Sequence, residues 1–274
     1  MSIRSSHPTG WLSYDTVAQT YDRVAVPWFE PLARDLVSTV GLTVGERVLD
    51  VGTGTGLTAG LASVTVGSGG VVIGVDPSTG MLALARARRG VLSAAAMAPG
   101  LPFPDASFNA VVANLVISHL PDLTHGLADM VRVLRRGGRL GVSAWGPDPI
   151  PSRDQGSEAD TIVASVREAC GLPSEAPVKG APWEQQLRSR AQLCDALTRA
   201  GLRQTNAQLQ TYQRTFSIDD YLSGWGGLGR YLRWQAGEGP WRDFTDRAAT
   251  TLRERFGNTI ISVKQAWVAT GTAP

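Results

Sequence analysis

Apolar runs of five to seven residues alternate with stretches of helical periodicity along the first half of the chain. The apolar runs predict strands at 46–51, 71–76, 91–96, 109–115 and 139–145. The periodic stretches predict helices at 11–22, 29–40, 56–65, 79–89 and 123–135, the last of them ending at Gly137-Gly138. Strands that alternate with helices form a parallel sheet covered on both faces, so we expect an α/β fold of the doubly wound, Rossmann-like kind.

The regular alternation stops after Gly146-Pro147-Asp148-Pro149. Two more helices are predicted, near 158–169 and at 189–200, and two more strands, at 202–215 and 258–270. These strands bring the expected sheet to seven, mostly parallel. The stretch 217–256 between them is predicted to be helical, with Ser217 as the first cap and Asp220 three residues on.

Three glycines on alternate positions follow the first predicted strand, which ends in Asp50. Gly52 and Gly54 lack a Cβ, so the backbone can turn sharply there and a ligand can approach it. A dinucleotide fingerprint places its third glycine three residues after the second, whereas Gly56 comes two residues after Gly54. A carboxylate at Asp50 repels a pyrophosphate and attracts an ammonium group. The loop therefore suits a cationic ligand that carries an amino acid better than it suits NAD.

The second predicted strand also ends in an acid, Asp76, which lies 20 residues after Gly56. A carboxylate at this strand end can accept two hydrogen bonds from a ribose diol. The alternative is a helix cap, because Pro77-Ser78 follows and a helix begins near Thr79. Met81, on the first turn of that helix, faces either the adenine side of a ligand or the core.

These pieces, with the turn Leu101–Phe108 and the segment Val131–Leu140, resemble class I S-adenosylmethionine-dependent methyltransferases of the small-molecule type. Among these the chain is similar to the methyltransferases of ubiquinone and menaquinone biosynthesis. The resemblance covers Tyr14 to about Trp145 and implies S-adenosylmethionine as cofactor and S-adenosylhomocysteine as product. It says almost nothing about the methyl acceptor.

The resemblance also implies roles for individual residues. Gly52, Thr53 and Gly54 would contact the methionine part of the cofactor. Asp50 would bind its ammonium group, and Asp76 would bind its ribose. The remaining cofactor residues on this interpretation are Tyr14, Tyr21, Pro77, Met81, Met97, Ala98 and Asn114. Tyr14 and Tyr21 match an N-terminal helix that folds over the cofactor; they lie two helical turns apart, so packing on one helix face explains them equally well.

Three positions depart from the family pattern. Met97 stands, before Ala98, where the family usually has the Asp that binds the adenine amino group, so apolar contact and backbone groups would hold adenine. Asn109 replaces an Asp before strand four, and Arg136 replaces a Pro before Gly137. Met97 leaves room for a cofactor site that is weakened or repurposed.

The resemblance divides the chain into functional parts. These are N-terminal helices that cover the cofactor site at 1–45, a cofactor-binding core at 46–146, an insert with strand six at 147–215, a helical lid at 216–257 and the last strand at 258–274. Trp225, Tyr231 and Trp234 in the lid would bind an apolar or planar acceptor, or would anchor the lid to the sheet. His119, after strand four, is the candidate for a catalytic base and acceptor contact; a structural role is the alternative.

Composition narrows the function further. The formal net charge is +2 and no basic cluster occurs, which argues against nucleic-acid binding. The two cysteines have no metal-ligand spacing, and we expect no metal. No apolar run approaches a membrane span and the first residues contain no apolar core, so we expect a cytoplasmic chain without a signal peptide. Whether the chain forms a homodimer stays open.

The sequence thus supports methyl transfer to an apolar or aromatic small molecule at oxygen, nitrogen or carbon. The alternative is a methyltransferase-like protein that binds the cofactor and catalyses a reaction without methylation, such as a cyclisation. An NAD(P)-dependent oxidoreductase is disfavoured by Asp50 and the short glycine spacing.

Overall fold

The computed structural model describes residues 10–147, 154–174, 187–224 and 226–274. The strands are β1 Arg47–Val51, β2 Val71–Asp76, β3 Leu92–Ala95, β4 Phe108–Ala113, β5 Leu134–Trp145, β6 Arg203–Ser217 and β7 Thr259–Thr272. The α-helices are α1 Ala18–Val24, α2 Val26–Val40, α3 Leu57–Val66, α4 Thr79–Arg89, α5 Leu123–Arg132, α6 Gly156–Ala169, α7 Arg190–Arg199, α8 Ile218–Tyr221, α9 Gly227–Ala236 and α10 Glu238–Phe256. Two 3₁₀ helices, η1 Gly10–Val17 and η2 Ile117–His119, complete the described elements.

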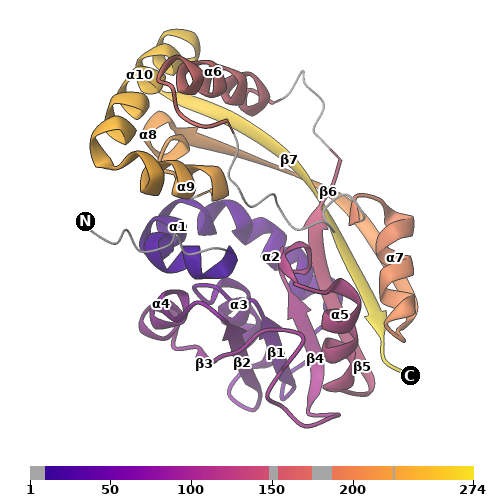
Figure 1. Cartoon of the computed structure of the whole chain (residues 1–274). Helices are drawn as coiled ribbons and strands as arrows, with labels where there is room; N and C mark the ends of the chain where they lie inside the picture. The colour runs from indigo at the N-terminus through magenta and orange to yellow at the C-terminus, as the bar shows by residue number, and fades with distance from the viewer. Residues whose placement is uncertain (1–9, 148–153, 175–186, 225) are drawn as a thin grey trace.

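The strands form one seven-stranded sheet in the order β3-β2-β1-β4-β5-β7-β6 (Figure 1). β1 to β5 are parallel, and β7 runs antiparallel to both of its neighbours. The expected seven-stranded, mostly parallel Rossmann-like sheet is therefore confirmed. The strand order reverses between β1 and β4, which leaves a crevice at their carboxyl ends where folds of this kind bind ligands.

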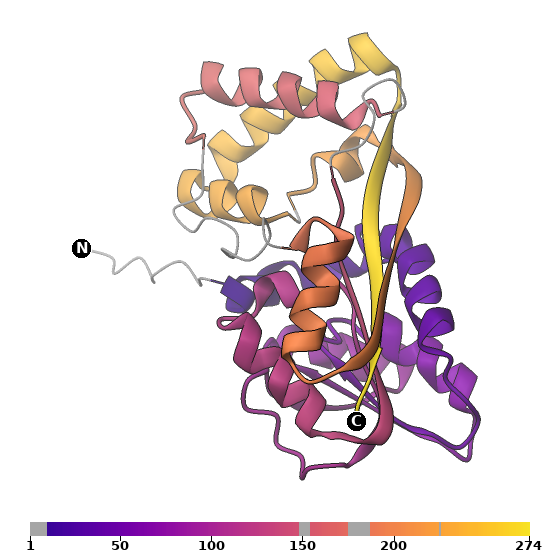
Figure 2. The ribbon, with the colours of Figure 1, turned by 90° about the vertical axis from the view of Figure 1, so that its right-hand side faces the viewer.

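Successive residues of β1 pack into apolar layers on opposite faces of the sheet. Val48 packs in a cluster with Leu36 of α2, whereas Leu49 packs in a cluster with Leu127 of α5. Successive side chains of a strand point to opposite faces, so this pair shows that both faces of the sheet are buried. Figure 2 shows α2 on the opposite side of the strands from α5 and α7.

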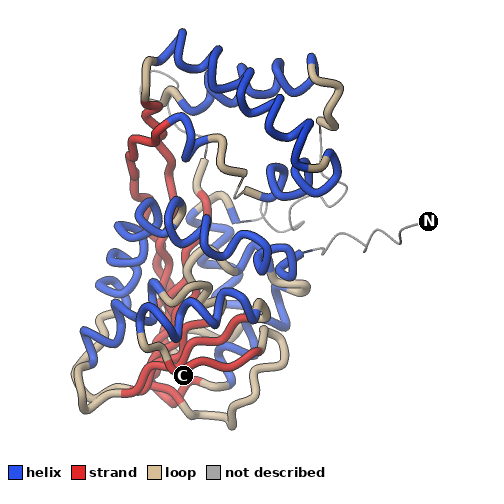
Figure 3. Tube along the Cα trace, turned by 90° about the vertical axis from the view of Figure 1, so that its left-hand side faces the viewer, coloured by secondary structure: helices blue, strands red, loops and turns tan. Residues whose placement is uncertain are grey.

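β6 and β7 continue past the rest of the sheet as a two-stranded ribbon. β5 ends where Trp145 pairs with Ala266, but the pairing of β6 with β7 continues to Ser217 and Thr259. α8, α9 and α10 lie between these two strands in the chain and, with α6, form a helical lid at the end of the ribbon (Figures 1 and 3). Most of the described residues of the segment 216–257 are helical, as the sequence predicts, and α6 packs against α10. We call α6 and α8 to α10 the lid, and the action of 216–257 as a lid stays a prediction.

The segment before α6 covers the free edge of the ribbon. Val263 N–H donates to Asp154 Oδ1 at 2.8 Å, and Ile261 N–H donates to Gln155 Oε1 at 2.8 Å. Gln155 N–H in turn donates to the Ile261 carbonyl at 2.9 Å. These bonds satisfy backbone groups that an open strand edge would leave exposed, so they tie the lid to β7.

The helix predicted at 123–135 is shorter in the structure, and this prediction was wrong at its end. α5 stops at Arg132 because Phe108 N–H donates to the Val133 carbonyl at 3.0 Å and Leu134 pairs with Phe108 in the sheet. The register then shifts before Arg139 pairs with Ala110. Gly137, at φ +71°, lies in this irregular stretch of β5 and is not a helix cap.

The N-terminal helix expected at 11–22 is divided in two. Its first half is the 3₁₀ helix η1, and α1 begins at Ala18. α2 begins at Val26, three residues before the predicted start, because Pro27 fits the first turn of a helix. Within the described ranges, no helix combines the length and the apolar character that a membrane span needs.

Candidate functional site

The glycine-rich loop after β1 has a left-handed backbone at Gly52, Gly54 and Gly56, with φ of +69°, +55° and +88°. A Cβ on Gly52 would lie 2.3 Å from a methyl carbon of Val116, so this position also needs the space. A Cβ on Gly54 would meet nothing within 4 Å. The loop therefore packs tightly at Gly52 and faces open space at Gly54, which suits the close approach of a ligand.

Asp76 at the end of β2 is bonded to this loop. Its carboxylate accepts from Gly54 N–H at 2.9 Å and from Ser78 N–H at 2.8 Å. Ser78 is the cap of α4, because its hydroxyl accepts from Met81 N–H at 3.2 Å, and the interpretation of Asp76 as the helix cap was wrong. Each carboxylate oxygen has a second lone pair, so Asp76 can still accept from a ribose diol.

Asp50 lies beneath the loop and is only 1% exposed. Its carboxylate accepts from the Thr53 hydroxyl at 2.7 Å. Burial raises the pKa of Asp50 to about 7, and burial followed by the nearby charge of Asp15 raises the pKa of Asp76. These carboxylates give the loop a negative field that favours a cationic ligand and disfavours a pyrophosphate. Asp50 does not line the cavity beside the loop, so its contact with an ammonium group stays a prediction.

The N-terminal segment η1–α1 covers the loop and is bonded to α4. Asp15 accepts from the Ser78 hydroxyl at 2.6 Å and from Gly80 N–H at 2.8 Å. Asp22, buried on α1, forms ion pairs with Arg88 and Arg89 of α4. Arg89 also donates to the Thr55 carbonyl of the loop at 2.8 Å. Carboxylates of the cover thus hold it to α4, and Arg89 links it to the loop.

Tyr14 and Tyr21 meet edge to face under this cover, with ring centroids 5.8 Å apart. Burial raises the pKa of Tyr21, so its hydroxyl keeps its proton. Arg230 of α9 lies 4.0 Å from the centre of the Tyr14 ring. The cover is therefore in contact with the lid as well as with α4.

Between the cover and the loop lies a cavity of about 40 Å³. It is lined by Tyr21, Val26, Phe29, Gly52, Thr53, Gly54, Thr55, Leu57, Thr58, Asn114 and Leu115. Asp76 does not line this cavity, but its carboxylate is bonded to Gly54, which does. The open backbone at Gly54 and this adjacent carboxylate fit a cofactor with an amino acid and a ribose. Its volume is far below the roughly 300 Å³ of small-molecule sites, so the cover must move for such a ligand to enter.

β4 ends at Ala113, two residues before the predicted end. The next two residues, Asn114 and Leu115, line this cavity. Asn114 Oδ1 accepts from the Ser143 hydroxyl at 2.6 Å, and that hydroxyl accepts from Leu115 N–H at 2.8 Å. Leu115 has φ +56°, a conformation that costs a branched residue energy and that concentrates at functional sites. His119 is exposed on η2 and lines neither described cavity, so its role as a base stays a prediction.

The four residues expected on the adenine side of the site are buried or half-buried. Ala98 and Met81 are buried, and Met97 and Pro77 are half-buried around the ends of β2 and β3. None of these four residues lines the 40 Å³ cavity. Their contact with an adenine ring stays a prediction.

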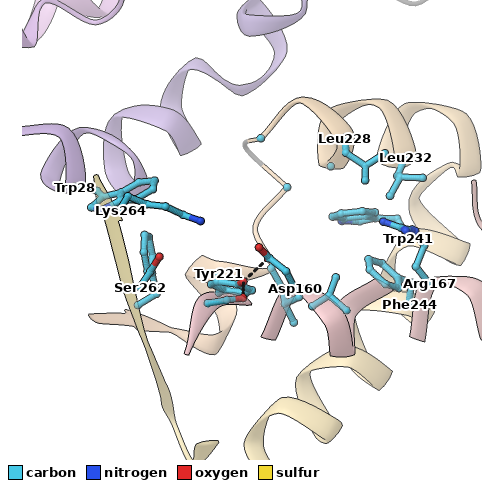
Figure 4. A pocket seen from close by; sticks show the side chains of 17 residues that line it. Trp28, Asp160, Arg167, Tyr221, Leu228, Leu232, Trp241, Phe244, Ser262 and Lys264 are labelled. Atoms are coloured by element: carbon cyan, nitrogen blue, oxygen red, sulfur yellow. Dashed lines mark hydrogen bonds between the residues drawn. The ribbon is translucent and has the colours of Figure 1, made fainter. Parts of the chain in front are cut away.

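The lid encloses a second cavity of about 270 Å³. Aromatic and aliphatic side chains make up most of its wall: Trp28, Val163, Phe216, Tyr221, Leu222, Leu228, Leu232, Trp241 and Phe244 (Figure 4). Four polar side chains complete it: Asp160, Arg167, Ser262 and Lys264. An apolar cavity with few polar groups is typical of small-molecule sites.

This lid cavity differs from the acceptor site expected from the sequence. Tyr231 and Trp234 lie on α9 with ring centroids 6.3 Å apart, but neither lines the cavity. Trp225 lies outside the described residues. The contacts of these three residues with an acceptor stay predictions.

A partition of aromatic rings separates the two cavities. Trp28 stacks on Phe29 and on Trp145, with ring centroids 5.1 and 5.5 Å apart, and meets Phe216 edge to face at 5.5 Å. The sequence interpretation singled out neither Trp28 nor Phe29 nor Trp145 for the site. The Trp28-Phe29 pair in an amphipathic helix was the available signal, but only the fold places this pair between the cavities.

Comparison with known proteins places the loop and its surrounding strands in a family. Residues 49–142 match a family described as methyltransferase domain. An aklanonic acid methyltransferase of Streptomyces sp. (strain C5) is 36% identical over 48% of this chain and 63% of its own length. A nocamycin O-methyltransferase of Saccharothrix syringae is 35% identical over 57% of each chain. A demethylmenaquinone methyltransferase of Beutenbergia cavernae is 36% identical over 50% of this chain and 58% of its own length.

The match of residues 49–142 to a methyltransferase domain confirms the resemblance seen in the sequence. The chain spans about three fifths of the length of these curated relatives. Among solved structures, a possible histamine N-methyltransferase of Thermotoga maritima has a TM-score of 0.55 at 20% identity and covers 96% of this chain and 99% of its own. The [4+2]-cyclase SpnF has a TM-score of 0.56 at 20% identity, over 96% and 95%. At this identity both show the fold alone, the class I methyltransferase fold.

Proposed function

We propose that this protein transfers a methyl group from S-adenosylmethionine to an apolar or aromatic small molecule. The observation that carries the proposal is the hydrogen bond between Gly54 N–H and the Asp76 carboxylate within a matched methyltransferase domain. This bond joins the open backbone at Gly54 to a carboxylate that can also accept from a ribose diol, which supports the proposal. The buried carboxylate of Asp50 adds the negative charge that a sulfonium cofactor with an ammonium group requires.

The cofactor would supply the electrophilic methyl group, and the protein would supply position and exclusion of water. Asp76 would hold the ribose, the backbone at Gly54 would hold the methionine part, and the cover η1–α1 would close over both. Ion pairs from Asp22 to α4 keep that cover shut once it has closed.

The acceptor would occupy the lid cavity, where Trp28 on one side and Trp241 and Phe244 on the other present flat apolar surface. Phe216 packs against Trp28 and also lines the cavity. The Trp28 and Phe29 rings separate this cavity from the one beside the loop, so they would have to shift for the acceptor to reach the methyl group. Two of the matched relatives are named for aklanonic acid and for nocamycin O-methylation. These names support a small organic acceptor.

Product analysis with methyl-labelled S-adenosylmethionine tests the proposal. The protein is incubated with the labelled cofactor and a panel of aromatic carboxylic acids and hydroxyquinones, and products are analysed by mass spectrometry. We expect one labelled methyl group in a product, lost with Asp76→Ala and retained with Asp195→Asn, an exposed residue on α7. A product that forms without the label would contradict methyl transfer and favour the alternative, a cyclisation.

A further inference from the structure

The lid cavity is apolar over most of its surface, yet it carries two cations. Lys264 comes from β7, and its amine points from beside Trp28 into the cavity (Figure 4). Arg167 comes from α6 and lies beside Trp241 and Phe244 (Figure 4). Asp160 is the carboxylate of the wall, and the Tyr221 hydroxyl donates to it. The charged side chains of the wall therefore leave an excess of one positive charge.

Lys264 is half-buried, and within the described ranges its amine forms no hydrogen bond and no ion pair. Its positive charge contributes to the lowered pKa of Asp154, after the hydrogen bonds from Val263, Ser157 and Gly156. Those three bonds already hold the Asp154 carboxylate in place below the cavity. Asp154 offsets part of the charge of Lys264, while the amine itself stays directed at the open space.

Arg167 adds a second observation of the same kind. Its Nε is buried and has no hydrogen-bond partner among the described residues. A buried donor without a partner lowers stability, and more so when the group is charged. An anionic ligand in the cavity would give one of these cations a partner.

The use of lysine in this chain makes Lys264 unusual. Of the 26 cationic residues, only Lys179 and Lys264 are lysines. Lysine is a compact point charge on a flexible stem, and it can follow an oxyanion that has no fixed orientation. A lysine at this position therefore suits a carboxylate on a ring system that enters and leaves the site.

On the basis of the proposed function, we propose that the acceptor is an aromatic carboxylic acid. Its carboxylate binds Lys264, and its ring system lies on the apolar wall formed by Trp28, Phe216, Trp241 and Phe244. Asp160, which accepts from the Tyr221 hydroxyl, repels an anion close to it, so the carboxylate is expected at the amine of Lys264. Lys264 thereby sets the orientation of the acceptor and has no contact with the cofactor.

A matched pair of fluorescent probes tests this inference with the full chain. Anthracene-2-carboxylate and anthracene-2-carboxamide share one ring system and differ in charge. We expect the wild type to bind the carboxylate at least tenfold more tightly than the amide at low salt. Lys264→Gln should weaken binding of the carboxylate about tenfold, as the loss of one charge-assisted hydrogen bond implies, and should leave binding of the amide within twofold.

The controls separate charge from fold. Lys264→Arg should retain the preference for the carboxylate, and Arg199→Gln, which removes one exposed charge on α7, should change neither probe. After reductive methylation with labelled formaldehyde, the Lys264 signal, assigned with Lys264→Arg, should shift in the nuclear magnetic resonance spectrum when the carboxylate is added.

Equal affinity of wild type for the two probes, or an equal loss of both with Lys264→Gln, would overturn the inference. Titration of the same samples with S-adenosylmethionine separates this failure from that of the proposed function. A protein that binds the cofactor but does not prefer the carboxylate refutes only the acid acceptor. A protein that prefers the carboxylate but does not bind the cofactor refutes only methyl transfer.

Discussion

Trp28 and Phe29 are neighbours in α2, yet they line different cavities. Trp28 belongs to the wall of the lid cavity, and Phe29 to the wall of the small cavity beside the glycine-rich loop. Their rings stack with centroids 5.1 Å apart. One turn of helix therefore contributes to the walls of both cavities, and on the proposed function the cofactor and the acceptor would meet there.

Trp28→Ala should damage the lid cavity and spare the cofactor site. Loss of the stacked contacts should lower the free energy of unfolding by about 2–4 kcal/mol. Binding of anthracene-2-carboxamide should weaken at least fivefold, while the Kd for S-adenosylmethionine, measured by calorimetry, should stay within twofold. Trp234→Ala is the matched control, because Trp234 is 42% exposed and lines neither cavity. A larger loss of probe binding with Trp234→Ala would show that the acceptor lies elsewhere in the lid.

Gly52→Ala and Gly54→Ala should differ in stability although both positions have positive φ. Backbone strain costs each variant about 1 kcal/mol. Gly52→Ala also brings a Cβ to 2.3 Å from Val116, and overpacking adds about 1–3 kcal/mol. Urea unfolding measures the stability of both variants. Gly52→Ala should cost less stability when it is introduced into Val116→Ala than when it is introduced into the wild type. Equal stability of the two glycine variants would contradict the close contact at Gly52.

Asp22→Asn should loosen the cover over the loop. Asp22 is 6% exposed and faces two arginines, so loss of its charge should cost about 2 kcal/mol and speed amide hydrogen exchange in residues 10–24. Asp219→Asn, which breaks an exposed pair with Arg253, should cost under about 1 kcal/mol. No change of exchange in residues 10–24 would contradict the role of Asp22.

The same pair predicts a dependence on pH. Burial alone would raise the pKa of Asp22, but the Thr55 hydroxyl, the hydrogen bond and charge of Arg89 and the hydrogen bond of Arg88 outweigh it and lower the pKa. A lowered pKa gives stability that is present above the unfolded value of about 4 and is lost as the pH falls through the folded value. The stability difference between wild type and Asp22→Asn, measured by urea unfolding, should therefore shrink below about pH 4. A difference that stays constant from pH 6 to pH 3 would show that no ionised Asp22 is involved.

Asp50 should make cofactor binding depend on pH near neutrality. Burial raises its pKa to about 7, so the carboxyl is mostly protonated at pH 6 and mostly ionised at pH 7.5. Because the ionised form attracts the ammonium group, affinity for S-adenosylmethionine should rise about fivefold over this range. Calorimetry at both values should show the rise in wild type and a flat response in Asp50→Asn. An equal rise in the variant would assign the effect to another group.

The sheet could be predicted from the sequence because each of its strands carries a local signal. β2 and α4 coincide with their predicted ranges, and the apolar run before Asp50 gave β1 within one residue. The end of α5 was wrong because the pairing of Leu134 with Phe108, a contact between distant segments, outweighed the local helix pattern. Propensity cannot decide such a competition.

The residues of the candidate site also differ in whether the local sequence indicates their position. Asp50, Gly54 and Asp76 follow strand ends, and the order of the strands alone brings them together. Lys264 faces the lid cavity only because β7 continues past the end of β5, and no pattern within β7 indicates this. The acceptor side of the site therefore needed the structure, whereas much of the cofactor side did not.

Calorimetric titration of the full chain with S-adenosylmethionine and with S-adenosylhomocysteine tests the central claim most directly. We predict binding of both by the wild type, loss of at least tenfold in affinity with Asp76→Ala, and no change with Asp195→Asn. Circular dichroism of each variant confirms that it is folded. Absence of binding by a folded wild type, or undiminished binding by Asp76→Ala, would contradict the assignment of this crevice to the methyl donor.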